Sequence, residues 1–85
     1  MIRPGTNVRL NTQLFFGNAN VRFGPKMKVL VNQYVPKGAT GVVEEVNEAE
    51  ALVEFYWNAT GTPGMGDTAH LWVKRVLWGF LEVVD

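Results

Sequence analysis

Few side chains in this 85-residue sequence have the chemistry of a catalytic or metal-binding group. The sequence contains one histidine, His70, and no cysteine or serine, so it lacks the Ser–His and Cys–His pairs of nucleophilic catalysis. A single histidine also cannot supply the usual two or three nitrogen or sulfur ligands of a metal site. Asp67 and Glu54 could approach His70, but a lone histidine beside a strand is ordinarily a surface residue, and we expect His70 to be exposed.

The carboxylates gather within a predicted strand and turn, at Glu44, Glu45, Glu48 and Glu50. Such a cluster is typical of solvated charge, whereas acid–base catalysis by paired carboxylates requires two groups held in defined positions around a substrate. The sequence therefore predicts a protein that is not an enzyme and that uses no metal and no cofactor.

A glycine-rich loop, NATGTPGMGD at residues 58–67, is the third candidate site. A P-loop requires a lysine after its glycines and a helix beyond it, and a dinucleotide-binding loop requires the order G-x-G-x-x-G before a helix. Here the order is G-x-x-G-x-G and the residues that follow have the pattern of a strand. We expect the loop to connect a hairpin, with an anion site as the less favoured alternative.

The elements that must position these groups are predicted to be β-strands. Valine, threonine and aromatic residues dominate, and glycine, proline or asparagine interrupts the sequence about every ten residues. Val43 and Val46 lie three residues apart, out of phase for one sheet face, which predicts a β-bulge near Glu44 and Glu45. Strands are expected at residues 6–10, 20–23, 27–31, 41–46, 51–57, 69–75 and 80–85, with a loop at 32–40 and a 3₁₀ turn at 76–80.

Alternation within two of these strands assigns side chains to the two sheet faces. The core-facing set is Ala51, Val53, Phe55, Trp57, Ala69, Leu71 and Val73, and the outward set is Leu52, Glu54, Tyr56, His70, Trp72 and Lys74. Tyr56 and Trp72 are thus predicted to be exposed, with Leu52 and His70 near them and Trp78 at the edge. Exposure of a large apolar side chain forfeits roughly 1.5 to 3 kcal/mol. We therefore expect a cover: the N-terminal segment 1–26, a second copy of the chain, or a foreign ligand.

The stretch 27–85 resembles an SH3-like small β-barrel. Within it, KGATGVVEEV at 37–46 is similar to a KOW-type motif, through Gly38, Gly41, Val43 and Val46 and the VEF strand at 53–55. The resemblance implies an all-β fold: a five-stranded small barrel over about 27–85, with residues 1–26 as an N-terminal β extension in one domain of 1–85. It also implies a tight start of a curved strand at Gly41, where a side chain would collide with the loop.

Proteins of this resemblance bind RNA, DNA, ribosomal or transcription proteins, or peptides, or serve as accessory subunits of enzymes, so the fold does not select one function. Charge is unevenly distributed: residues 1–43 hold six cations and no acid, and residues 44–85 hold eight acids and two cations. This separation predicts either a basic and an acidic face, which favours self-pairing, or strands that interleave and mix the charges.

The first hypothesis is a non-catalytic binding module that acts by self-association or by docking on a protein. Its exposed aromatic surface would comprise Leu52, Tyr56, His70, Trp72 and Trp78. The first alternative is a KOW-like RNA- or DNA-binding protein that uses Phe15, Phe16, Arg22, Phe23, Lys26 and Lys28, although a pI of about 6.6 opposes phosphate binding. The second alternative is a small-molecule-binding or enzyme accessory subunit, in which oligomerisation multiplies His70 at a symmetry axis.

Apolar stretches are too short to span a membrane, and the first ten residues lack the apolar segment of a secretory signal. We therefore expect a cytoplasmic protein that does not bind membranes.

Overall fold

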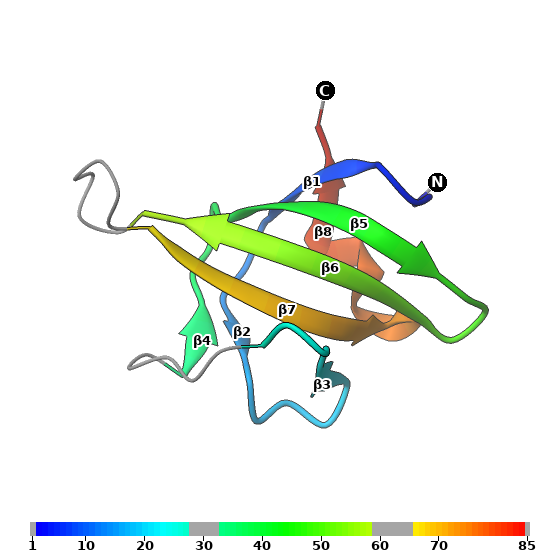
Figure 1. Cartoon of the computed structure of the whole chain (residues 1–85), viewed down its shortest axis with the longest axis horizontal. Coiled ribbons are helices and arrows are strands. Elements are labelled where there is room, and N and C mark those ends of the chain that lie inside the picture. Colours follow the sequence, from blue (N-terminus) through cyan, green and yellow to red (C-terminus); the bar gives the residue numbers. More distant parts are fainter. Residues whose placement is uncertain (1, 28–32, 59–65, 85) are drawn as a thin grey trace.

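The computed structural model describes residues 2–27, 33–58 and 66–84 and is an all-β structure (Figure 1). A six-stranded antiparallel sheet has the strand order β3-β7-β6-β5-β1-β8, and β2 pairs with β4 in a separate two-stranded ladder. The elements are β1 (Asn7–Leu10), β2 (Leu14–Phe15), β3 (Val21–Phe23), β4 (Tyr34–Val35), β5 (Thr40–Val46), β6 (Glu50–Trp57), β7 (Asp67–Lys74), the 3₁₀ helix η1 (Arg75–Phe80) and β8 (Leu81–Val83). Among the described residues, no helix has the length and apolar character that crossing a membrane requires.

The antiparallel meander β5-β6-β7 forms the centre of the sheet. The predicted alternation is confirmed, because all seven side chains assigned to the core are buried: Ala51, Val53, Phe55, Trp57, Ala69, Leu71 and Val73. The predicted bulge is also confirmed, since the β5–β6 register shifts between Val43 and Glu45 and leaves Glu44 as the extra residue. The β5–β6 turn is closed by Asn47, whose Oδ1 accepts the amide protons of Ala49 and Glu50 at 2.8 and 2.7 Å.

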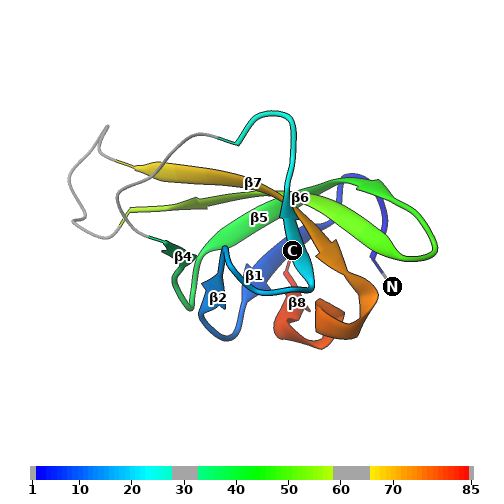
Figure 2. The same cartoon turned by 90° about the horizontal axis from the view of Figure 1, so that it is seen from below.

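The N-terminal segment is built into the sheet. β1 pairs with β5 on one side and with β8 on the other, next to η1 (Figure 2), while β3 extends the opposite edge by pairing with β7. Val8 and Leu10 of β1 are fully buried in the same core as Phe55 and Leu71. The 3₁₀ turn predicted before the last strand is confirmed as η1.

The expected closed five-stranded barrel over 27–85 is wrong. Within the described parts of the chain the sheet is open, with β3 and β8 as its outer strands and no pairing between them. The physical reason is that β1 fills the place between β5 and β8, so these two strands do not meet. Most of the strand expected at 27–31 lies outside the described residues, and part of the expected loop at 32–40 forms the short strand β4.

Gly41 is a point of close approach between β5 and β6. A Cβ atom there would come within 2.8 Å of Val53 Cγ1, 3.0 Å of Phe55 Cδ1 and 3.2 Å of the Glu54 carbonyl oxygen. A side chain at Gly41 would therefore collide with residues of the neighbouring strand β6, whereas the sequence predicted a collision with the loop.

We predict that Gly41→Ala destabilises the fold by about 1 to 3 kcal/mol, the usual effect of overpacking a filled core. The matched control is Gly17→Ala, because a Cβ atom at Gly17 meets nothing within 4 Å. Urea unfolding followed by tryptophan fluorescence measures both variants. Equal unfolding midpoints for the two would contradict the close approach at Gly41.

Candidate functional site

The face of the sheet opposite the core carries three cross-strand rows of side chains, which follow from the strand registers. The first row contains Arg9, Thr40, Tyr56 and Thr68; the second contains Asn7, Val42, Glu54 and His70; the third contains Glu45, Leu52, Trp72 and Arg22. We call this surface the outer face. One part of the outer face, around His70 and Leu52, is buried, and another part, around Tyr56 and Val42, is exposed.

A short segment after β3 covers part of the outer face. Residues 24–27, called the strap, begin where the Gly24 N–H donates to the His70 carbonyl oxygen at 2.7 Å. Gly24 lies so close to the sheet that a Cβ atom would come within 2.6 Å of His70 Nδ1 and 2.8 Å of Leu52 Cδ1. His70 is 2% exposed and Leu52 is 4% exposed, so the expectation that both are exposed is wrong. The strap, which belongs to the N-terminal segment, is their cover.

Hydrogen bonds fix the protonation of His70. Its Nδ1 accepts the backbone N–H of Lys26 at 3.0 Å, so this nitrogen carries no proton. The ring proton therefore lies on Nε2, which faces Glu44 Oε1 at 2.6 Å and donates to it. The neutral imidazole thus joins the strap to β5 across β7.

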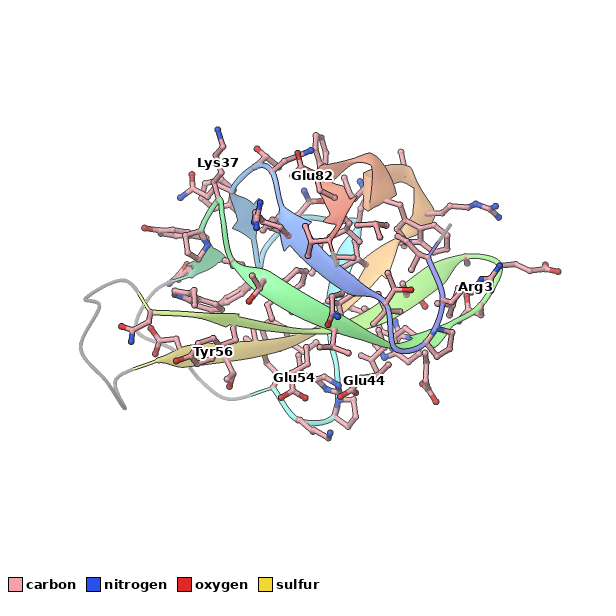
Figure 3. All side chains as sticks on the ribbon, turned by 90° about the horizontal axis from the view of Figure 1, so that it is seen from above. Arg3, Lys37, Glu44, Glu54, Tyr56 and Glu82 are labelled. Carbon is pink, nitrogen blue, oxygen red and sulfur yellow. The ribbon has the colours of Figure 1, made fainter. Side chains whose placement is uncertain are left out.

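Ion pairs surround this histidine. The Lys26 ammonium lies 3.4 Å from a Glu44 carboxylate oxygen and 3.7 Å from one of Glu54. The hydrogen bond from His70 is the main cause that holds the pKa of Glu44 below its ordinary value, and Lys26 adds to the effect. Glu44 and Glu54 point to the same side of the sheet (Figure 3).

A second ion pair covers Trp72. Arg22 Nε and Nη2 donate to the two carboxylate oxygens of Glu50 at 2.8 and 2.9 Å, and the guanidinium carbon lies 4.7 Å from the centre of the Trp72 ring. The hydrogen bonds between them raise the pKa of Arg22 and lower that of Glu50. Since Arg22 and Lys26 come from the basic half of the sequence and pair with acids of the other half, the structure favours the mixed arrangement of charges.

Glu44, Glu54 and His70 are close enough to be tested as a metal site, because one potential ligand atom of each lies within 4.8 Å of the others. A metal on His70 Nε2 would displace the proton to Nδ1, where it would oppose the Lys26 N–H. The Lys26 ammonium also already contacts both carboxylates. As folded, the three residues form an internal hydrogen-bonded ion network and do not fit a metal ion.

The aromatic residues predicted to form one exposed surface do not lie together in the open. Tyr56 is 48% exposed, whereas Trp72 is partly buried beneath Arg22. Trp78 packs partly against the core and donates its Nε1–H to the Val73 carbonyl oxygen at 3.0 Å. Of the five predicted residues, only Tyr56 is largely exposed.

The uncovered part of the outer face contains two hollows that meet at Tyr56 and Thr40. One, of about 560 Å³, is also lined by Arg9, Val42, Glu44 and Glu54; the other, of about 420 Å³, is also lined by Lys37 and Trp57. Val42 is 44% exposed. We call this region, defined by Arg9, Lys37, Thr40, Val42 and Tyr56, the open half. Arg9, Lys37 and Val42 are not among the binding residues predicted from the sequence, although alternation in NVRL and TGVV places Arg9 and Val42 outward.

Of the residues predicted to bind nucleic acid, some make contacts within the chain and others are exposed. Arg22 and Lys26 are engaged in ion pairs, and Lys28 lies outside the described residues. Phe15 and Phe23 are more than half exposed, while Phe16 is partly buried, with its ring edge-on to Phe23 at 5.9 Å. Phe15 and Phe23 are therefore accessible to a ligand, but the two described cations of this set are paired with carboxylates of the chain. Apart from its ends, the loop 58–67 also lies outside the described residues.

We predict that Glu44→Gln destabilises the fold by about 1 kcal/mol at neutral pH, because it replaces a charged hydrogen-bond acceptor of His70 by a neutral one. Since folding lowers the pKa of Glu44, its carboxylate contributes fully above the unfolded value of about 4.5 and loses this contribution as pH falls through the lower folded value. The difference from wild type should therefore shrink in acid. Urea midpoints across pH measure it.

The control for this prediction is Glu45→Gln, which removes an exposed carboxylate one residue away. We expect its effect to stay within about 0.5 kcal/mol. A difference between wild type and Glu44→Gln that does not depend on pH would contradict the assignment.

The outer face therefore offers a covered ion network at His70 and an open half at Tyr56. Comparison of the chain with protein-family models, curated proteins and solved structures finds no match.

Proposed function

We propose that this chain is a small, non-catalytic, SH3-like module that binds an extended segment of another protein on its open half. The strand path supports the fold assignment: a three-stranded meander, β5-β6-β7, is followed by the 3₁₀ helix η1, and β8 then returns to pair with β1. In this assignment β1, and not the segment after residue 27, is the first strand of the module, and β3 with the strap is an addition to it.

The exposed ring of Tyr56 is the observation that carries the proposal. It lies where the two hollows of the open half meet, with the exposed Val42 in one of them. A tyrosine in this position can bury its apolar ring against a partner while its hydroxyl remains hydrogen-bonded, which is why tyrosine is enriched at the centres of interfaces.

The charges around Tyr56 indicate the chemistry of the partner. Arg9 lines one hollow and Lys37 the other, and within the described parts of the chain neither forms a salt bridge. We infer an extended segment with an acidic side chain next to apolar ones. A phosphate backbone suits the surface less well than a single acidic side chain does, because it would bring several negative charges close to the acids there. Glu44 and Glu54 line the larger hollow, and Glu82 lies opposite Arg9 across β1 and β8.

Selection from a displayed library of random dodecapeptides tests the proposal. We expect the selected peptides to share an acidic residue beside apolar residues. Tyr56→Ala should weaken their binding at least tenfold, or about 1.4 kcal/mol, and Arg9→Gln should weaken the acidic peptides selectively. The matched control is Val76→Ala on η1, which removes an exposed apolar side chain (73% exposed) outside the open half and should leave binding unchanged.

Three results would overturn the proposal. One is selected peptides that bind the Tyr56→Ala variant as well as wild type. The second is light scattering that shows a dimer which Tyr56→Ala dissociates, since the open half would then be a self-interface. The third is a labelled single-stranded RNA that binds more tightly than any selected peptide and is released steeply by salt.

A further inference from the structure

We propose that the strap, residues 24–27, is a proton-operated cover of the outer face, which opens when His70 takes a second proton on Nδ1. The proposal rests on which hydrogen-bonding and charged groups around His70 belong to the strap and which belong to the sheet.

The Nδ1 atom of His70 can bond to the strap only while it has no proton. In the closed arrangement it accepts the Lys26 N–H at 3.0 Å, inside a site where His70 is 2% exposed. A proton on Nδ1 would place two N–H donors opposite one another and leave both without an acceptor. Because unsatisfied buried donors are strongly disfavoured, the protonated ring and the closed strap exclude each other.

The charged groups that face the ring come from three elements. The sheet contributes two carboxylates, Glu44 of β5 and Glu54 of β6, while the strap contributes the ammonium of Lys26. Arg22 of β3 is held by Glu50 and by Trp72. The sheet therefore carries the groups that favour a positively charged imidazole, and the strap carries both groups that oppose it, the Lys26 N–H and the Lys26 ammonium.

This division couples proton binding to opening. When the strap leaves, the opposing amide and ammonium leave with it, and the two carboxylates remain beside the ring. A proton therefore binds the open arrangement more tightly than the closed one, and by linkage acid shifts the population toward the open arrangement.

A short set of contacts opposes opening. The described contacts of the strap with the rest of the chain are the Gly24 N–H bond to the His70 carbonyl, the Lys26 N–H bond to Nδ1, the Lys26 ion pairs, the packing of Gly24 on Leu52 and the packing of the partly buried Met27 against the core. The Lys26 side chain is 66% exposed, and ion pairs of such exposed groups contribute little. Of the two hydrogen bonds that hold the strap to the sheet, the Nδ1 bond is the one that a proton removes.

Opening would uncover Leu52 and the imidazole next to the open half and lengthen the apolar surface toward Trp72. If the proposed docking function holds, acid therefore changes the surface that a partner meets. This consequence rests on the proposed function, whereas the opening itself does not.

Hydrogen exchange of the full chain, followed by NMR without any peptide, tests the opening. We expect the protection of the Lys26 amide, corrected for intrinsic exchange, to fall at least tenfold on acidification, in step with the protonation that the Nδ1 resonance reports. The amide of Val43, which donates to Thr6 within the sheet, is the internal control and should keep its protection.

Two variants separate the device from general acid destabilisation. In His70→Gln the amide oxygen can still accept the Lys26 N–H but takes up no proton, so protection of Lys26 should become independent of pH. In Lys26→Gln the N–H remains, but the ammonium that pairs with Glu44 and Glu54 in the closed strap is lost, so opening should move to higher pH. Lys74→Gln, which removes an exposed lysine that forms no salt bridge within the described residues, should not move it. Lys26→Gln changes an exposed side chain and serves as the decisive variant where His70→Gln does not fold.

Protection of the Lys26 amide that stays constant while Nδ1 takes up its proton would overturn the proposal, as would an equal loss of protection in His70→Gln. Both readouts are independent of docking. Selected peptides that fail to depend on Tyr56 would refute the docking function and leave the strap result standing.

Discussion

The one-residue bulge in β5 is the constraint on which the rest of the outer face depends. Strict alternation after Val43 would turn Glu45 toward the core and Val46 toward solvent. The extra residue Glu44 resets the phase, so that Glu45 stands opposite Leu52 and Val46 stands opposite Ala51 and packs against the core. The bulged residue Glu44 also provides the carboxylate that accepts the Nε2 proton of His70.

Charge then ties together segments that are far apart in the sequence. The N-terminal part of the chain provides β1 and β3 at nearly opposite ends of the sheet order, and its cations Arg22 and Lys26 meet acids of β5 and β6. A basic first half and an acidic second half are thus an arrangement for pairing within one molecule. Among the described cations that form no salt bridge, Arg9 and Lys37 lie at the open half.

Local patterns in the sequence predicted the elements whose structure depends on neighbours in the chain. The phase break between Val43 and Val46 predicted the bulge, alternation identified the core-facing residues of β6 and β7, and the VLWGF stretch predicted the 3₁₀ turn. These features need only the period of a strand. The all-β class followed from the same signals.

Long-range pairings were not predictable in this way. No local signal places β1 between β5 and β8, and this pairing is why the expected barrel over 27–85 was not found. The exposure expected for His70 and Leu52 failed for a related reason: alternation identifies the face of a side chain but not the segment that crosses it. Gly24 and Pro25 indicated only a break, and the passage of this break over the outer face depends on the β3–β7 register.

The pairing of β1 with β8 has a consequence for the connectivity of the chain. Val8 and Val83 are direct partners, so the path through the sheet begins and finishes on neighbouring strands (Figure 1). A fold with adjacent ends can be inserted into a surface loop of a host protein, or circularly permuted, without breaking a ladder. The turn at residues 47–49 is the natural place for new ends, because it is exposed and lies outside the strands.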